Sequence, residues 1–106
     1  MKKITFFILV LFSSNIYAEE KVYFFSGNEL LERLEIENKY WSGSIGYLNG
    51  LIDSLTYSRQ VCVTENVTTE QIRDFSLKVL KENPSIRHHA AASFLIPEFQ
   101  KNFPCN

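Results

Sequence analysis

The sequence predicts a small all-α protein, a bundle of four or five helices stapled by one disulfide bond. Three observations predict this class. Apolar residues recur at steps of three or four in four successive segments, which is the period of a helix. No segment shows the alternation of apolar and polar residues that is typical of a strand. The chain has two cysteines, far apart in the sequence, behind a segment that reads as an export signal.

Residues 1–18 have the three parts of a secretory signal peptide. Two lysines follow the first methionine, an apolar run extends from Ile4 to Phe12, and a polar patch leads to Ala18. The apolar run is too short to span a bilayer, which takes about 20 residues. We therefore expect cleavage after Ala18. Residues 19–106 are expected to form a single helical domain in the periplasm, with no membrane segment left.

The mature part of the chain is small and mildly acidic. Removing 18 of the 106 residues leaves 88, and because the signal carries two lysines and no acids, the formal charge changes from −1 to −3. No basic patch is large enough to hold nucleic acid, so nucleic acid is not an expected partner. A chain of this size forms only a modest hydrophobic core and often needs a disulfide or a similar cross-link to be stable.

Cys62 and Cys105 are the two cysteines. In an oxidising compartment the two thiols of a small domain usually pair, and the loop-entropy estimate for this bond is roughly 4 kcal/mol. The alternatives are a reactive thiol and an intermolecular bridge, but the sequence has no C-x-x-C motif and no histidine near either cysteine. We expect an intramolecular disulfide that pins the last helix to the end of an earlier one.

The first helix is expected from about Asn28 to Lys39. Ser26 and Glu29 have the spacing of a capping box, and leucines make one face of the helix. These leucines are Leu30, Leu31 and Leu34. The preceding residues, Lys21 to Phe25, are expected to form an N-terminal arm that packs its aromatic side chains.

The second helix is expected within residues 40–60. Its apolar residues at helical spacing are Trp41, Ile45, Leu48, Ile52 and Leu55. Gly46 and Gly50 lie four residues apart on one side, and we interpret them as points where another backbone comes close. Packing within one monomer is the favoured interpretation, and a dimer interface is compatible with it.

The third helix is expected to begin at Thr68, which has capping-box spacing to Gln71, and to end at Asn83-Pro84. Its core face carries Ile72, Phe75 and Val79. The fourth helix is expected within residues 85–103. Its inner face carries Ile86, Ala90, Phe94 and Leu95. Because Pro97 has no backbone N–H, we expect a kink or a break there.

Residues with catalytic or metal-binding chemistry are few. His88 and His89 are neighbours on the expected fourth helix, where neighbours point about 100° apart, so they cannot share a metal ion on one face. No Ser-His-Asp spacing is present, the disulfide would use both thiols, and Asp53 has no acid or base beside it at helical spacing. We expect no enzyme activity, no metal and no cofactor.

Four segments occur in the order and spacing of a known family: SGNELLERL, GYLNGLIDSL, VCVTENVTTEQIRDFSLKVLKENPSIRHHAAASFLIPEF and NFPC. They resemble the Rap/Tai family, small periplasmic immunity proteins of bacteria with type VI secretion systems, over about Phe25 to Cys105. The resemblance implies a helical protein, often a homodimer, that binds a peptidoglycan-cleaving amidase toxin and blocks its active-site cleft.

One departure from the family concerns a second cysteine pair. Many members carry cysteines at the positions of Leu34 and Ser44, and both are missing here. The loss of both cysteines together is expected if they form a disulfide with each other in those members. The Cys62–Cys105 disulfide is then the one that this chain retains. The connection between the first two helices therefore lacks that constraint.

Candidate contacts with the toxin follow from residue type, because binding energy concentrates in a few aromatic and arginine side chains. Tyr40 lies at the first turn between helices, and Arg87, His88 and His89 lie at the last. Each could instead serve the fold, and Trp41 is interpreted as core because it continues the apolar side of its helix.

An alternative function comes from a different class. A small periplasmic helical protein with one long-range disulfide also resembles the acid-stress chaperones of enteric bacteria. Such a chaperone should lose its tertiary structure near about pH 2–3, as carboxylates protonate, and then hold client proteins. An immunity protein should instead bind one toxin.

Overall fold

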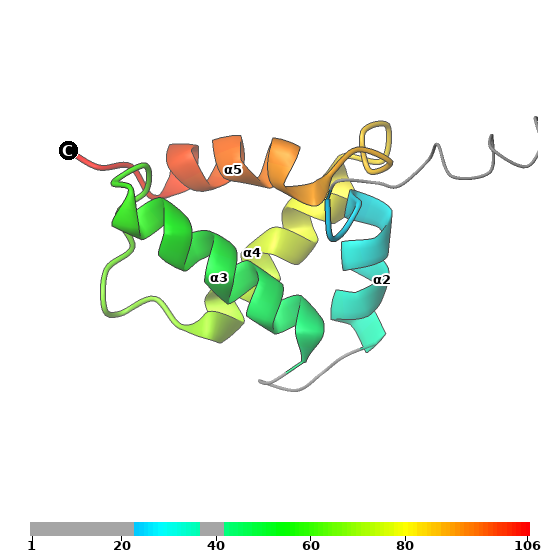
Figure 1. Ribbon diagram of the computed structural model, residues 1–106, viewed down its shortest axis with the longest axis horizontal. Coiled ribbons are helices and arrows are strands. Elements are labelled where there is room, and N and C mark those ends of the chain that lie inside the picture. The colour runs from blue at the N-terminus through cyan, green and yellow to red at the C-terminus, as the bar shows by residue number, and fades with distance from the viewer. Residues whose placement is uncertain (1–22, 37–41) are drawn as a thin grey trace, which may run out of the picture.

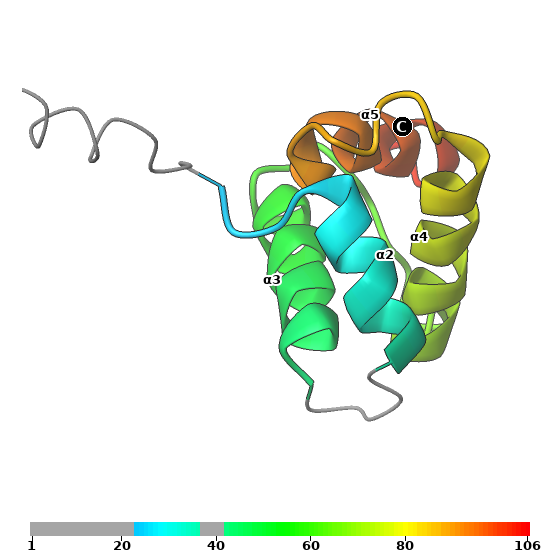
Figure 2. The same cartoon turned by 90° about the vertical axis from the view of Figure 1, so that its right-hand side faces the viewer.

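The computed structural model describes residues 23–36 and 42–106. Four helices account for most of this part of the chain: α2 (Gly27–Ile36), α3 (Gly43–Tyr57), α4 (Thr69–Glu82) and α5 (Ala91–Asn102). The predicted all-α class is confirmed (Figure 1). Helices α2 and α4 each pack against the other three helices. Figure 2 shows α2 between α3 and α4, with α5 covering one side of that group.

The core is built largely from the helical faces that the periodicity predicted. The exception is α5, where Leu95 is buried as expected but Ile86, Ala90 and Phe94 are only half-buried, and where Phe99, which the sequence did not single out, is fully buried. The side chains without any exposed surface include Leu30 and Leu34 of α2, Leu80 of α4, and Leu95 and Phe99 of α5. All the predicted apolar residues of α3 in the described part are buried as well, namely Ile45, Leu48, Ile52 and Leu55. Burying one such side chain contributes about 1.5–3 kcal/mol, so these faces hold the helices together. Trp41, which was expected to continue the α3 face, lies outside the described residues.

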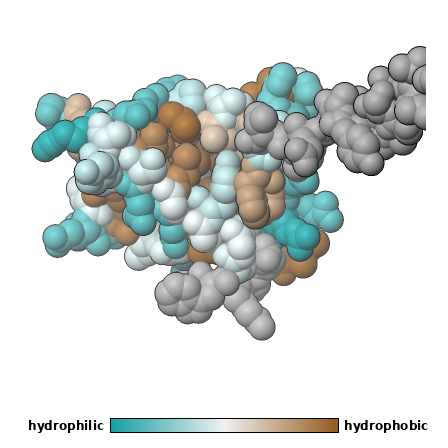
Figure 3. Space-filling model, viewed as in Figure 1, coloured by the Kyte–Doolittle hydropathy of each residue, from teal (hydrophilic) through white to brown (hydrophobic). Residues whose placement is uncertain are grey.

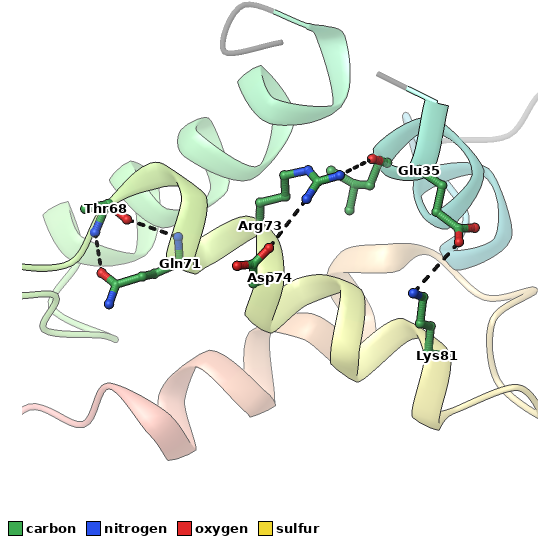
Figure 4. Close-up of polar contacts among 7 residues, drawn as sticks. Glu35, Thr68, Gln71, Arg73, Asp74 and Lys81 are labelled. Carbon is green, nitrogen blue, oxygen red and sulfur yellow. Dashed lines mark hydrogen bonds and ion pairs between the residues drawn. The ribbon is translucent and has the colours of Figure 1, made fainter. Parts of the chain in front are cut away.

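Both predicted capping boxes are present. The Glu29 amide donates to Ser26 Oγ at 3.1 Å, and the Ser26 amide donates to the Glu29 carboxylate at 3.0 Å. At the start of α4, the Gln71 amide donates to Thr68 Oγ1 at 3.1 Å, and the Thr68 amide donates to Gln71 Oε1 at 2.7 Å (Figure 4). Each box satisfies two amides that a helix cannot satisfy by itself, and so fixes where α2 and α4 begin.

Helix α5 begins later than the sequence predicted. It starts at Ala91, and residues 84–89 form turns, so the expected helix over Ser85 to Ala90 is wrong. The reason lies in the first amides of α2, which need acceptors. Gly27 N–H donates to the His89 carbonyl at 2.9 Å, and Asn28 N–H donates to the Arg87 carbonyl at 2.8 Å. The turn therefore presents its carbonyls to α2.

The opposite end of α2 is held by α4 (Figure 4). The guanidinium of Arg73 donates from Nη2 to the Leu34 carbonyl at 2.8 Å, and its Nη1 lies 3.4 Å from Asp74 Oδ1. In the last turn of α4, Lys81 Nζ lies 3.9 Å from Glu35 Oε2. The short helix α2 is thus bonded at both ends by segments far along the chain. The expected extension of this helix to Lys39 lies outside the described residues.

Pro97 lies inside α5, and the helix continues through it. The expectation was a kink or a break at this position, and a break is wrong. A proline removes the N–H that would bond the carbonyl four residues earlier, which here is Ser93. Ser93 and Pro97 are both exposed, so water can bond that carbonyl while the apolar side of α5 stays packed on the core.

The glycines of α3 do not have the role that the sequence suggested. A Cβ placed on Gly46 or Gly50 would meet nothing within 4 Å, and both residues are exposed. The interpretation of close packing within the monomer is wrong at these two positions. The close approach occurs at Gly27, where a Cβ would lie 2.9 Å from the Arg87 carbonyl oxygen.

The disulfide between Cys62 and Cys105 is present, with Cα atoms 5.0 Å apart. It joins the segment after α3 to the tail after α5. Beside it, Cys62 N–H donates to the Phe103 carbonyl at 2.9 Å. This confirms the prediction that the tail cysteine pins the last helix to the end of an earlier one. In Figure 1 this end of the molecule lies at the left, near the C-terminus.

Candidate partner-binding surfaces

Among residues 23–36 and 42–106, no group of three or more His, Cys, Asp or Glu side chains could hold a metal ion. No helix in the same residues is long and apolar enough to cross a membrane. The described surface offers exposed aromatic, basic and amide side chains, which are suited to contacts with a partner. Three surfaces offer such side chains: the turn before α5, the N-terminal arm, and the end of α3.

The turn before α5 contains three of the four predicted contact residues. Arg87 is half-buried, its carbonyl bonds α2, and its Nε is buried without a hydrogen-bond partner in the described chain. His88 and His89 are exposed, and their ring centroids lie 4.1 Å apart. The expectation that helical geometry holds these rings about 100° apart is wrong, because they lie in a turn. The backbone of this segment serves the fold, and its two histidine rings remain free for a partner.

The other positions singled out in the sequence have separate outcomes. Tyr40, the fourth predicted contact, lies outside the described residues. Leu34 and Ser44, the positions at which the resemblance led us to note a missing cysteine pair, are both fully buried. Leu34 belongs to the apolar core, and the Ser44 hydroxyl lies 3.2 Å from the Ser42 hydroxyl. Neither side chain is available to a partner.

The N-terminal arm packs its aromatic rings, as predicted. Phe25 meets Tyr47 of α3 edge-on with centroids 5.2 Å apart, and Phe24 stacks on Tyr47 at 6.4 Å. Burial raises the pKa of the Tyr47 phenol above its ordinary value, and a hydrogen bond with the Ala92 backbone partly opposes this. Sequence reasoning missed Tyr47, although its position beside Leu48 on α3 is a signal that it borders the core. The rings of this arm pack on α3, so the arm serves the fold and offers little free surface to a partner.

The end of α3 was also missed. Gln60 N–H donates to the Leu55 carbonyl at 2.8 Å and Arg59 N–H donates to the Thr56 carbonyl at 3.1 Å, which is the Schellman pattern of a helix end. That pattern needs a left-handed residue, usually glycine, and here it is Arg59 with φ 60°. Tyr57, two residues earlier, is 92% exposed. The absence of a glycine after the last apolar residue of α3 is the signal that could have pointed here.

Arg59→Gly is expected to raise the free energy of unfolding by about 0.5–1 kcal/mol. A left-handed residue with a side chain costs about 1–2 kcal/mol, and the greater freedom of glycine in the unfolded chain offsets part of that gain. Urea unfolding followed by circular dichroism measures the difference. Arg59→Ala is the matched control, since it removes the side chain but keeps the Cβ, and it should not be stabilised. If the Arg59→Gly variant is less stable than the wild type, the inference that the Arg59 backbone is strained is wrong.

The fold defines a class: a small, all-α protein of four packed helices with one disulfide bond. Comparison with protein-family models identifies its family. The model described as Rap1a immunity proteins matches residues 26–105. The chain belongs to the Rap1a immunity protein family, and the resemblance seen in the sequence is confirmed.

A search of curated proteins and a search of solved structures each found no match. Membership of an immunity family, which is non-catalytic, confirms that the chain is not an enzyme. It also implies a cognate toxin as partner. The family and the disulfide together favour the periplasm.

Proposed function

We propose that this protein is exported to the periplasm, where it binds and neutralises a peptidoglycan amidase toxin delivered by a type VI secretion system. One observation carries the proposal: the match to immunity proteins spans residues 26–105, which is the whole bundle from the cap of α2 to the tail cysteine. The proposed export depends on cleavage of residues 1–18 after Ala18.

Inhibition of this kind needs surface fit and no reaction. A protein that blocks a cleft must present a few side chains in fixed positions, because ordering them on binding would reduce the affinity. Caps at both ends of α2, a buried apolar core and a disulfide supply such a scaffold. His88 and His89 in the turn before α5 belong to the set of contact candidates that the sequence predicted, together with Tyr40 and Arg87. A homodimer is part of the proposal, and light scattering on the purified mature protein tests it.

The proposal is tested by protection from lysis. Type VI secretion amidase toxins, together with any toxin encoded beside this gene, are each targeted to the periplasm of a host cell that carries either the full chain or residues 19–106 preceded by methionine. We expect lysis to be suppressed by the exported chain only, because the toxin acts on peptidoglycan outside the cytoplasm. A pull-down with the mature chain should recover the toxin.

Two further results separate the parts of the proposal. If the exported chain folds but protects against no amidase, while it protects against a neighbouring toxin of another hydrolase class, the amidase target is wrong and the immunity function stands. If it protects against no toxin at all, the proposed function is wrong for this chain. A periplasmic protein of the same size with an unrelated sequence serves as the control for expression load.

A further inference from the structure

Tyr57 differs from the other large apolar side chains that the described surface exposes. Phe24, 73% exposed, stacks on Tyr47, and Ile36, 67% exposed, adjoins residues outside the described part. Tyr57 is 92% exposed and contacts no other ring in the described residues. No contact among the described residues accounts for an aromatic side chain at this position on the last turn of α3.

Arg59, two residues further, is held in a conformation that favours glycine. Left-handed residues with side chains persist where the surrounding structure enforces them, and such strain is found most often at functional positions. Within the described residues no ion pair involves Arg59, and the side chain is exposed. Its guanidinium is therefore free to bond a partner, while its backbone position is fixed by the end of α3.

The surroundings make this end of α3 rigid. On one side, Leu55 is buried and its carbonyl accepts from the Gln60 amide. On the other side, Val61 is fully buried, and Cys62 is tied to the tail by the disulfide and by its bond to Phe103. A short exposed segment between two buried residues loses little freedom on binding, which favours affinity.

We propose that Tyr57 and Arg59 are the anchors by which this chain holds its cognate toxin. This inference rests on the proposed function. Tyrosine and arginine are enriched among the residues that carry most binding energy at interfaces. The chemistry of these two side chains defines what the toxin must offer. The phenol ring of Tyr57 would pack into an apolar or aromatic recess of the toxin. A carboxylate at the edge of that recess would accept two hydrogen bonds from the planar guanidinium of Arg59.

This surface is distinct from the histidine turn. The turn precedes Ala91 at the start of α5, whereas the tail that is bonded to Cys62 follows Asn102 at its end. A helix of 12 residues is about 18 Å long, so the two surfaces lie at opposite ends of α5 (Figure 1). The left end of the face seen in Figure 3 is largely polar. Single variants can test the two ends separately.

The test measures binding of the mature chain, with its disulfide intact, to a purified toxin. The toxin is the one against which the chain protects in the lysis assay, with its catalytic nucleophile replaced. Tyr57→Ala and Arg59→Gly are each expected to raise the dissociation constant of the complex by about 10-fold or more. Arg59→Gly is the sharper variant because it should bind more weakly while unfolding at higher urea, a combination that damage to the fold cannot produce. Lys78→Ala, exposed on α4 and in no described ion pair, should change binding by less than about 2-fold.

Two results would overturn the inference while the proposed function stands. In one, the wild type binds the toxin and both variants bind within about 2-fold of it. In the other, only the double variant His88→Ala/His89→Ala loses affinity, which would place the toxin at the histidine turn. If the wild type binds no toxin, both proposals fall. Unfolding curves for every variant show that the comparison is between folded proteins.

Discussion

Replacing both Cys62 and Cys105 with serine is expected to lower the free energy of unfolding by about 4 kcal/mol. The two cysteines are 43 residues apart, so the bond removes a large part of the freedom of the unfolded chain. Small domains have total stabilities of about 5–15 kcal/mol, and this loss is a large share of that. The variant should therefore be partly unfolded at 37 °C.

Urea unfolding followed by far-UV circular dichroism measures this effect, in oxidised wild type and in the double serine variant. Wild type treated with a reducing agent is the matched control and should behave like the variant. A loss below about 1 kcal/mol would show that the loop-closure argument does not apply here, for example because the reduced unfolded chain keeps these segments together. The single variants Cys62→Ser and Cys105→Ser should each form intermolecular disulfides, which non-reducing gels detect.

Gly27→Ala is expected to lower the free energy of unfolding by about 2–3 kcal/mol. A Cβ at this position would lie 2.5 Å from Phe94 Cζ, 2.9 Å from the Arg87 carbonyl oxygen and 3.0 Å from Arg87 Cα. The phenyl ring can rotate away, but the Arg87 backbone cannot move without breaking the hydrogen bonds that Gly27 and Asn28 donate to the turn. The substitution therefore separates α2 from the segment that caps it.

Gly46→Ala is the matched control for this prediction. A Cβ at Gly46 meets nothing within 4 Å, and alanine is favoured over glycine inside a helix by up to about 1 kcal/mol, so this variant should be stabilised. The two variants make the same chemical change in two helices, and only the space around the Cβ differs. Equal effects on stability would show that the close approach at Gly27 is absent in solution.

Much of the fold could be predicted because its signals are local. Ser26 with Glu29, and Thr68 with Gln71, mark helix starts through side chains three residues apart, so tertiary contacts are not needed to recognise them. The disulfide could be predicted because the chain has two cysteines, so only one internal pairing exists, and because residues 1–18 have the pattern of an export signal.

The predictions that were wrong concern competition between local preference and distant partners. Ser85 to Ala90 have the spacing of a helix, yet their carbonyls bond the amides of Gly27 and Asn28 instead. Pro97 is a helix breaker by its local chemistry, yet α5 continues because its apolar side is buried against the core. In both cases contacts with other helices outweigh the local preference.

The candidate site shows the same division. The sequence pointed to Arg87, His88 and His89 by residue type, and the structure leaves two exposed rings there but uses the Arg87 and His89 carbonyls for the fold. Tyr57 and Arg59 carry no motif. Their interest comes from exposure and from a left-handed backbone, and both depend on how α3 ends against the rest of the bundle.

The amino-acid sequence by itself determined the helical class, the helix caps, the disulfide and the family. Periodicity, capping residues and the count of cysteines are properties of the chain alone. Only the tertiary structure decided which glycine is closely packed, where α5 begins and which side chains stay exposed. Those features depend on the acceptors and atoms that distant segments bring to a position, such as the Arg87 carbonyl at Gly27, and no pattern of neighbouring residues contains that information.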